Sequence, residues 1–133
     1  MRRFKMMERP LGVRVDARRR RRQQLLRVLW WVCISFIAVT SLVPGALRPS
    51  LGIGDKAEHF AAYFLATALA FLAYQGKVGR VAALLAVAAI VFEALQLAVP
   101  GRSASILDFA ASLAGIGTAL TLREIGRRLS SRE

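Results

Sequence analysis

Charged and polar side chains stand at the ends of long apolar stretches of this sequence, where they could bind a ligand or transfer a proton. One such stretch opens on Asp55, Lys56 and His59. The next holds Glu93 and Gln96 near its end. Cationic side chains such as Lys56 bind phosphate or carboxylate groups of a ligand, and neighbouring carboxylates hold these cations in place. The candidate ligand-binding residues are Asp55, Lys56, His59, Tyr63, Glu93, Gln96, Arg102, Asp108 and Ser112.

Helical spacing would place these side chains on shared faces, because residues three or four apart in a helix lie on the same side. Small residues accompany the set that contains Asp108, and they let membrane helices approach closely enough for polar side chains to reach across. Charges within a membrane usually face the interior of a bundle and pair there. The sets are Asp55, His59 and Tyr63; Glu93 and Gln96; and Asp108, Ser112 and Gly115.

Acid–base catalysis is one chemistry that these residues could perform. The catalytic candidates are His59, Glu93 and Asp108, since an imidazole with a carboxylate can serve as general acid and base. The sequence contains no nucleophile elbow, phosphate-binding loop or His-Glu-x-x-His helix. His59 is the only histidine, so the sequence predicts no zinc or other metal site and no cofactor.

Four apolar stretches are long enough, or nearly so, to cross a hydrocarbon core, which takes about 20 helical residues. The segments between them are rich in Gly, Pro and Ser, which break helices. None of the stretches shows the strict alternation of a membrane β-barrel strand. The sequence therefore predicts an all-α integral membrane four-helix bundle. Its predicted helices cover residues 25–43, 57–75, 81–99 and 105–122.

The basic residues predict how this bundle is oriented. The chain has 133 residues, 56% of them hydrophobic, and a formal net charge of +12. Eleven of its twenty Lys and Arg lie in residues 1–27 and four in the last eleven residues, unlike the basic face of a nucleic-acid-binding domain. With both termini cytoplasmic, seventeen basic residues lie inside, and only Arg48, Lys56 and Arg102 lie outside. This bias agrees with the positive-inside rule.

Composition divides the chain into three parts. Residues 1–24 form a basic cytoplasmic segment, residues 25–122 the membrane domain and residues 123–133 a basic cytoplasmic tail. A basic region before an apolar stretch also describes a secretory signal peptide. Here the basic region is long, the apolar stretch can span, and "VPGA" is a poor cleavage site. We therefore expect the first helix to be retained.

A structural role is the alternative for several of the polar residues. Asp55 followed three residues later by Glu58 is typical of a capping box at a helix start. Glu93 lies six residues before the end of its predicted helix, about 9 Å below that end, where a carboxylate indicates function.

The sequence also contains a candidate internal repeat. "HFAAY" at 59–63 echoes "DFAAS" at 108–112, as two hairpins related by a parallel repeat would.

The joint pattern resembles the VanZ-like family of small bacterial membrane proteins. "DKAEHFAAYFLA" and "EALQLAVPGRSASILDFAASLAG" carry the resemblance, which covers about residues 40–122. Serine at position 112 stands where the family pattern has asparagine, which leaves the role of this position open. The family pattern maps onto Asp55, Lys56, His59, Phe60, Glu93, Gln96, Arg102, Asp108 and Gly115.

The resemblance implies a multi-pass protein of the bacterial cytoplasmic (inner) membrane. The family's namesake is associated with low-level resistance to the glycopeptide teicoplanin, which acts at the outer face of that membrane. A role in the cell envelope is therefore what the resemblance implies for this chain.

Three classes of function remain open from the sequence. The first is an outer-leaflet pocket that binds a lipid headgroup or a lipid-linked cell-wall precursor, with membrane lipid and no nucleic acid as partner. The second is a membrane-embedded enzyme that acts on such a headgroup. The third is a small transporter, although the apolar inner halves of the helices offer no polar path. Four short Ala-rich helices enclose little volume, and a homodimer would enlarge the pocket.

Overall fold

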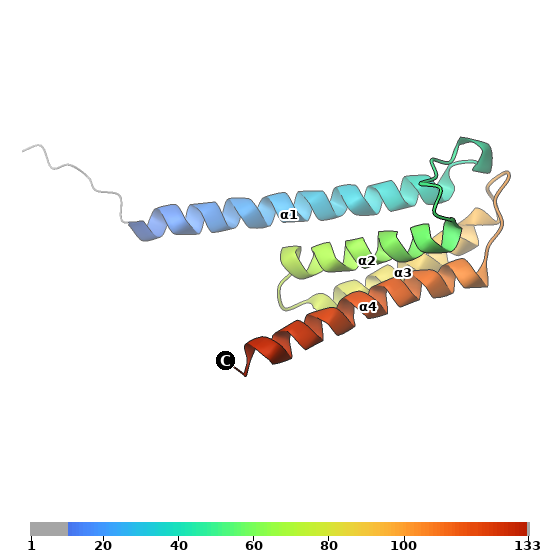
Figure 1. Ribbon diagram of the computed structural model, residues 1–133. Helices are drawn as coiled ribbons and strands as arrows, with labels where there is room; N and C mark the ends of the chain where they lie inside the picture. Colours follow the sequence, from blue (N-terminus) through green and yellow to red (C-terminus); the bar gives the residue numbers. More distant parts are fainter. Residues whose placement is uncertain (1–10, 133) are drawn as a thin grey trace, which may run out of the picture.

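The structure, a computed structural model, describes residues 11–132 and is helical throughout that range apart from short loops (Figure 1). Residues 1–10 of the predicted basic segment and residue 133 of the predicted tail lie outside the described residues. The elements are α1 (Leu11–Leu42), η1 (Gly45–Leu47, a 3₁₀ turn), α2 (Asp55–Ala73), α3 (Val78–Gln96) and α4 (Ile106–Ser130).

Two helices are longer than the sequence predicts, and both extend into the basic segments. α1 begins at residue 11 instead of residue 25, because residues 17–24 are Ala, Arg and Gln, which are good helix formers. α4 continues to residue 130 instead of 122. Its last turns gain support from Glu124, whose carboxylate pairs with Arg127 and Arg128 three and four residues later. Within the described range, the predicted basic segments are thus helical apart from residues 131–132.

Three helices are long and apolar enough to cross a membrane, which indicates a membrane protein. The segments are Ala17–Leu42 of α1, all of α3 and all of α4. α2, the second of the four predicted spans, is not among them. Its first turns carry Asp55, Lys56, Glu58 and His59, which lower the mean hydropathy of a helix only 19 residues long.

α2 lies against each of the other three helices and packs most extensively against α4. Gly115 makes that contact possible, because a Cβ at this position would meet the backbone oxygen of Phe60 and, at 3.0 Å, the backbone nitrogen of Phe64. On the other side of α2, the indole N–H of Trp30 in α1 donates a 3.0 Å hydrogen bond to the carbonyl oxygen of Ala66. The core around these contacts is built mainly of alanine and aliphatic side chains, so the helix backbones lie close together.

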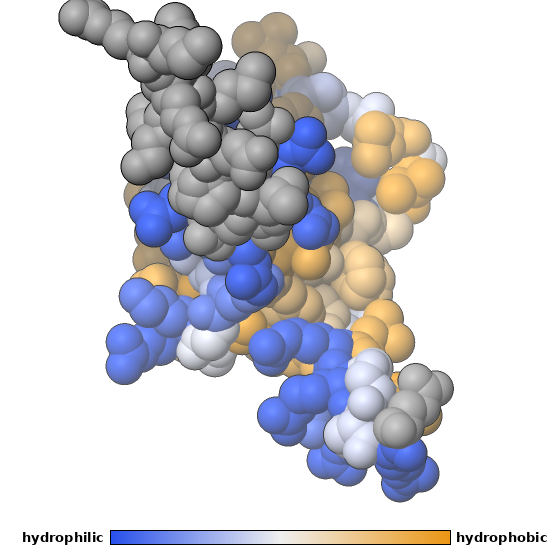
Figure 2. All heavy atoms as spheres, turned by 90° about the vertical axis from the view of Figure 1, so that its left-hand side faces the viewer, coloured by the Kyte–Doolittle hydropathy of each residue, from blue (hydrophilic) through white to orange (hydrophobic). Residues whose placement is uncertain are grey.

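Within the described residues, the fold separates the basic side chains into two groups at opposite ends of the molecule. Figure 1 shows that α1 and α3 end where α2 and α4 begin. Arg48, Lys56 and Arg102 belong to this end. The exposed arginines 18–22, Lys77 and the basic residues of the last turns of α4 belong to the other, where Figure 2 shows hydrophilic side chains gathered on the surface.

Candidate functional site

An open pocket of about 360 Å³ lies at the end of the molecule where α2 and α4 begin. Five of the nine predicted ligand-binding residues line it, from α2, the end of α3, the α3–α4 loop and the start of α4. Gly45, Arg48 and Ser50 of the α1–α2 loop, with Gly101 and Ser103 of the α3–α4 loop, complete the wall. The predicted residues that line the pocket are Asp55, His59, Gln96, Arg102 and Asp108.

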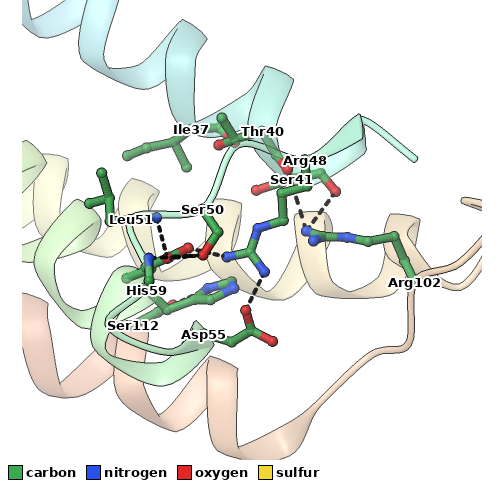
Figure 3. A network of polar contacts seen from close by, with 12 residues as sticks. Ile37, Thr40, Ser41, Arg48, Ser50, Leu51, Asp55, His59, Arg102 and Ser112 are labelled. Carbon is green, nitrogen blue, oxygen red and sulfur yellow. Dashed lines mark hydrogen bonds and ion pairs between the residues drawn. The ribbon is translucent and has the colours of Figure 1, made fainter. Parts of the chain in front are cut away.

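Arg48 organises the wall of the pocket that the α1–α2 loop contributes (Figure 3). Its guanidinium forms ion pairs with the carboxylates of Asp55 and Glu58, the latter at 2.7 Å. Glu58 also accepts hydrogen bonds from the Ser50 hydroxyl and the Leu51 backbone N–H, both at 2.7 Å. The predicted capping box is therefore wrong: Gly54, with φ 92°, is the N-cap of α2, and both acidic side chains fix the preceding loop.

Arg102 is the second guanidinium of the pocket and is held differently. One of its terminal nitrogens donates to the carbonyl oxygens of Thr40 and Ser41 at 3.4 and 3.2 Å, as Figure 3 shows. These carbonyls belong to the last turn of α1, where a positive charge is favourable. Across residues 11–132, no carboxylate lies within ion-pair distance of Arg102. Burial and then the neighbouring charge of Arg48 lower the pKa of Arg102, which still leaves an arginine protonated. Its positive charge is therefore available to an anion.

Three buried side-chain atoms in the described part of the chain lack a hydrogen-bond partner, and all three belong to residues that line this pocket. They are Nε2 of Gln96, Nε of Arg102 and Oδ1 of Asp108. Gln96 is only 2% exposed. Buried polar groups are nearly always paired, and leaving one unpaired costs roughly 1–3 kcal/mol. The residues that line the pocket thus hold two donor atoms and one acceptor atom without hydrogen-bond partners.

Glu93 does not line this pocket but binds the start of α4. Its Oε1 accepts a 2.8 Å hydrogen bond from the backbone N–H of Ser105, the N-cap residue. α3 ends at Gln96 and not at residue 99, because residues 97–99 form a tight turn before Pro100. Glu93 therefore lies three residues, about 4.5 Å, from the helix end instead of the expected 9 Å.

The cap of α4 explains why the Asp108 carboxylate is free. The Ser105 hydroxyl accepts a 3.3 Å hydrogen bond from the backbone N–H of Asp108. In a complete capping box, the acidic residue at the position of Asp108 would bind the backbone N–H of Ser105 in return. Here Glu93 binds that N–H, so the Asp108 carboxylate remains directed to the pocket that it lines.

Replacing Glu93 tests this capping role. We expect Glu93→Ala to lower the free energy of unfolding by about 1–2 kcal/mol, because the Ser105 N–H loses its partner. Glu93→Gln should cost well under half of that, since the amide oxygen can still accept. The measurement is the thermal unfolding of both purified variants in detergent, followed by circular dichroism. A catalytic role would predict the opposite ranking in function, with the glutamine variant inactive although stable.

His59 and Ser112 connect α2 with α4 beneath the pocket. Nδ1 of His59 lies 3.3 Å from the Ser112 hydroxyl oxygen, and that hydroxyl donates to the carbonyl oxygen of Asp108 at 3.0 Å. Because a hydroxyl has one hydrogen, Nδ1 of a neutral His59 must carry the proton in this contact. Nε2 is then an acceptor on the side chain that lines the pocket. Serine at position 112 thus orients the imidazole.

Two other predicted residues lie away from the pocket. Lys56 is exposed at the start of α2 and does not line the pocket. Tyr63 is 3% exposed and belongs to the hydrophobic core. The cation beside Asp55 is Arg48 instead of Lys56.

The sequence reasoning did not select Arg48 or the glycine contact that holds the two loops together. Gly45 N–H donates to the carbonyl oxygen of Pro100 at 3.2 Å, and a Cβ on Gly45 would meet the carbonyl oxygen of Gly101. The signal was present in the repeated "PG" dipeptides at 44–45 and 100–101, which mark tight turns. Nothing in their spacing indicated that the two turns meet.

No group of three or more His, Cys, Asp or Glu side chains within the described range could hold a metal ion. Comparison of the chain with protein-family models, with curated proteins and with solved structures found no match.

Proposed function

We propose that this chain is a multi-pass protein of the bacterial cytoplasmic membrane whose pocket binds a phosphate-bearing lipid headgroup or lipid-linked envelope precursor. The observation that carries the proposal is the convergence of three unpartnered buried polar atoms on one pocket that also holds two guanidinium groups. A phosphate supplies acceptors for Arg102 and Gln96. A hydroxyl or ammonium group on the same headgroup supplies the donor that Asp108 lacks.

The proposed orientation has both termini in the cytoplasm and the pocket at the outer leaflet. It rests on the segregation of basic residues, which are few at the pocket end and many at the other. We propose that α2 also crosses the membrane, since it lies against three helices and its 19 residues extend about 28 Å. The charged first turn of α2 would then lie at headgroup level beside Arg48.

We propose that the chain is a member of the VanZ-like family, on the sequence pattern described above. Asp55, His59, Gln96, Arg102 and Asp108 are members of the family pattern that also line the pocket. A site facing the outer leaflet fits a link to glycopeptides such as teicoplanin, which act there. This link is part of the proposal and is tested by measuring susceptibility with and without the gene.

An enzyme that acts on the bound headgroup is the second candidate. The geometry of His59 favours it, because Ser112 fixes one ring nitrogen and leaves the other available as a base. Release of a product from the bound lipid would distinguish an enzyme from a binding protein.

Removing the guanidinium of Arg102, which forms no ion pair within the described residues, tests the proposed function. The full chain would be placed in nanodiscs of equal phosphatidylglycerol and phosphatidylcholine, and retained lipid measured by native mass spectrometry. We expect Arg102→Gln to weaken phosphatidylglycerol retention by roughly tenfold or more, since buried charged contacts of this kind are worth at least 1.4 kcal/mol. Arg80→Gln, exposed at the other end of the molecule, is the matched control. Equal retention by native protein and Arg102→Gln would contradict the proposal.

A further inference from the structure

A second hollow opens beside the polar pocket and has a different lining. It occupies about 280 Å³ between α1 and α2, and most of its lining is apolar. Phe36 and Ile37 of α1 face Ala61, Ala62 and Leu65 of α2 across it. We call it the α1–α2 groove. The groove and the polar pocket share Arg48, Ser50, His59 and Arg102 as lining residues, so the two adjoin at the level of the guanidinium groups.

We propose that the α1–α2 groove holds one hydrocarbon chain of an anionic phospholipid whose phosphate lies in the polar pocket. This inference rests on the proposed function and adds to it the class of ligand and the path by which it enters. The ligand would be a phosphodiester lipid with a hydroxyl or amino group in its headgroup. It would enter sideways from the membrane, between α1 and α2.

The length and direction of the groove fit such a chain. On α2 the lining runs from Glu58 to Leu65, and on α1 from Ser41 back to Cys33, or about 11 and 12 Å along the helix axes. One leaflet of the hydrocarbon core is about 15 Å thick. The groove is therefore long enough to hold the hydrocarbon chain of a lipid through much of the outer leaflet, starting where the headgroup is bound.

The shape of the groove depends on two small residues of α2 and on large residues at its edges. Ala61 and Ala62 leave space on the α2 side, whereas Phe36 and Leu65 are large and respectively 63% and 52% exposed. Exposed aromatic and aliphatic side chains at the edge of a groove open it to the surrounding lipid. A chain could thus enter without first separating the helices.

The guanidinium groups of Arg48 and Arg102, where the groove adjoins the polar pocket, favour a lipid over a second copy of the protein as its occupant. Another apolar helix could cover Phe36 and Leu65, but it would bring no anion to Arg102. The unpaired Nε of Arg102 and Nε2 of Gln96 would then remain without partners. A phospholipid supplies both the apolar chain and the acceptor oxygens in one molecule.

Filling the groove tests the inference. Ala61 is exposed and lines the groove, so Ala61→Trp places a large ring there without displacing the core. Ala110 is the matched control: it is exposed on α4, lies outside both hollows, and also follows a phenylalanine in the echoed segment. In the nanodisc measurement, we expect Ala61→Trp to weaken phosphatidylglycerol retention by about tenfold or more, because an overfilled groove excludes a chain, and Ala110→Trp to leave it unchanged.

Two further arms separate the possible outcomes. Binding of water-soluble glycerol phosphate, which has no chain, should be equal in the native protein and Ala61→Trp. On the native protein, a phosphatidylglycerol with a photoreactive group midway along its acyl chain should label peptides around Phe36 and Leu65. Labelling spread over the exposed faces of α3 and α4, or crosslinks between two copies at the groove, would overturn the inference.

Failure of this inference and failure of the proposed function give different results. Unchanged retention in Ala61→Trp, with a loss in Arg102→Gln, would remove the chain from the groove and leave the headgroup site in place. Unchanged retention in both variants would remove both.

Discussion

Gly115→Ala is expected to lower the free energy of unfolding by about 3 kcal/mol, a large effect for one methyl group. The added Cβ would meet the carbonyl oxygen of Phe60 and the backbone nitrogen of Phe64. Both atoms belong to the backbone of α2, which cannot move aside by changing a rotamer. α2 and α4 would have to separate at their most extensive contact, and the apolar contacts on either side would loosen with them.

Gly117→Ala provides the control, because it makes the same chemical change two residues further along the same helix. A Cβ at Gly117 meets nothing within 4 Å. Alanine also favours a helix over glycine by roughly 1 kcal/mol, so this variant should be as stable as the native protein or more so. Thermal unfolding of both variants in the same detergent, followed by circular dichroism, measures the difference. Equal unfolding temperatures would contradict the close approach of α2 and α4.

The effect should extend to the pocket, since Gly115 lies one turn beyond Ser112. A wider separation of α2 and α4 would lengthen the contact between His59 and Ser112, which is already 3.3 Å. Gly115→Ala protein that remains folded should therefore also retain less anionic lipid than Gly117→Ala protein.

The lengths of the apolar runs predicted much of the fold, and the errors of this prediction have local causes. The helical segments were found because long apolar runs separated by Gly and Pro leave few alternatives. α1 and α4 were set too short because the prediction ended each helix where hydropathy fell, whereas arginine-rich segments also favour a helix. α3 has the predicted length but lies three residues earlier in the chain, because the apolar residues 97–99 lie in a turn set by Pro100 and Gly101.

The site was predicted in part because helix spacing determines which side chains share a face. His59, Gln96 and Asp108 meet at the pocket because each lies within a turn or two of a helix end at the same end of the molecule. Lys56 lies apart, since the residue after Asp55 points about 100° away around the helix. Arg48 lies in an irregular loop, where no periodicity applies, and only the folded chain brings it to Asp55 and Glu58.

Glu93 shows why a partly buried carboxylate in an apolar helix does not by itself indicate catalysis. Its depth in the membrane was inferred from its distance to the end of its own predicted helix, and it does not cap either end of that helix. The helix end that it caps belongs to α4, twelve residues later in the chain. A sequence gives the distance from a residue to the end of its own helix but not to the end of a neighbouring one.

Arg48→Ala is expected to cost about 2–3 kcal/mol of unfolding free energy, because it leaves the Glu58 carboxylate without its cation. The Arg48 and Glu58 side chains are only 15% and 11% exposed, and breaking a buried pair costs roughly 3–5 kcal/mol. The two hydrogen bonds that Glu58 accepts from Ser50 and Leu51 would persist, which reduces the loss. The unfolding free energy of Arg48→Lys should lie between those of the native protein and Arg48→Ala, since one ammonium group cannot reach both carboxylates with the geometry of a guanidinium.

Asp55 supplies the matched control for this ion pair, because it binds the same guanidinium from an exposed position. Its side chain is 60% exposed, so Asp55→Asn should cost less than about 1 kcal/mol. In the Arg48→Ala background, Glu58→Gln should restore part of the lost stability, since a neutral amide tolerates burial without a cation. Thermal unfolding of the four variants in one detergent tests all of these statements. If Arg48→Ala and Asp55→Asn had equal effects, the buried Glu58 pair would not be what fixes the α1–α2 loop, and the wall that this loop contributes to the polar pocket would need another source of stability.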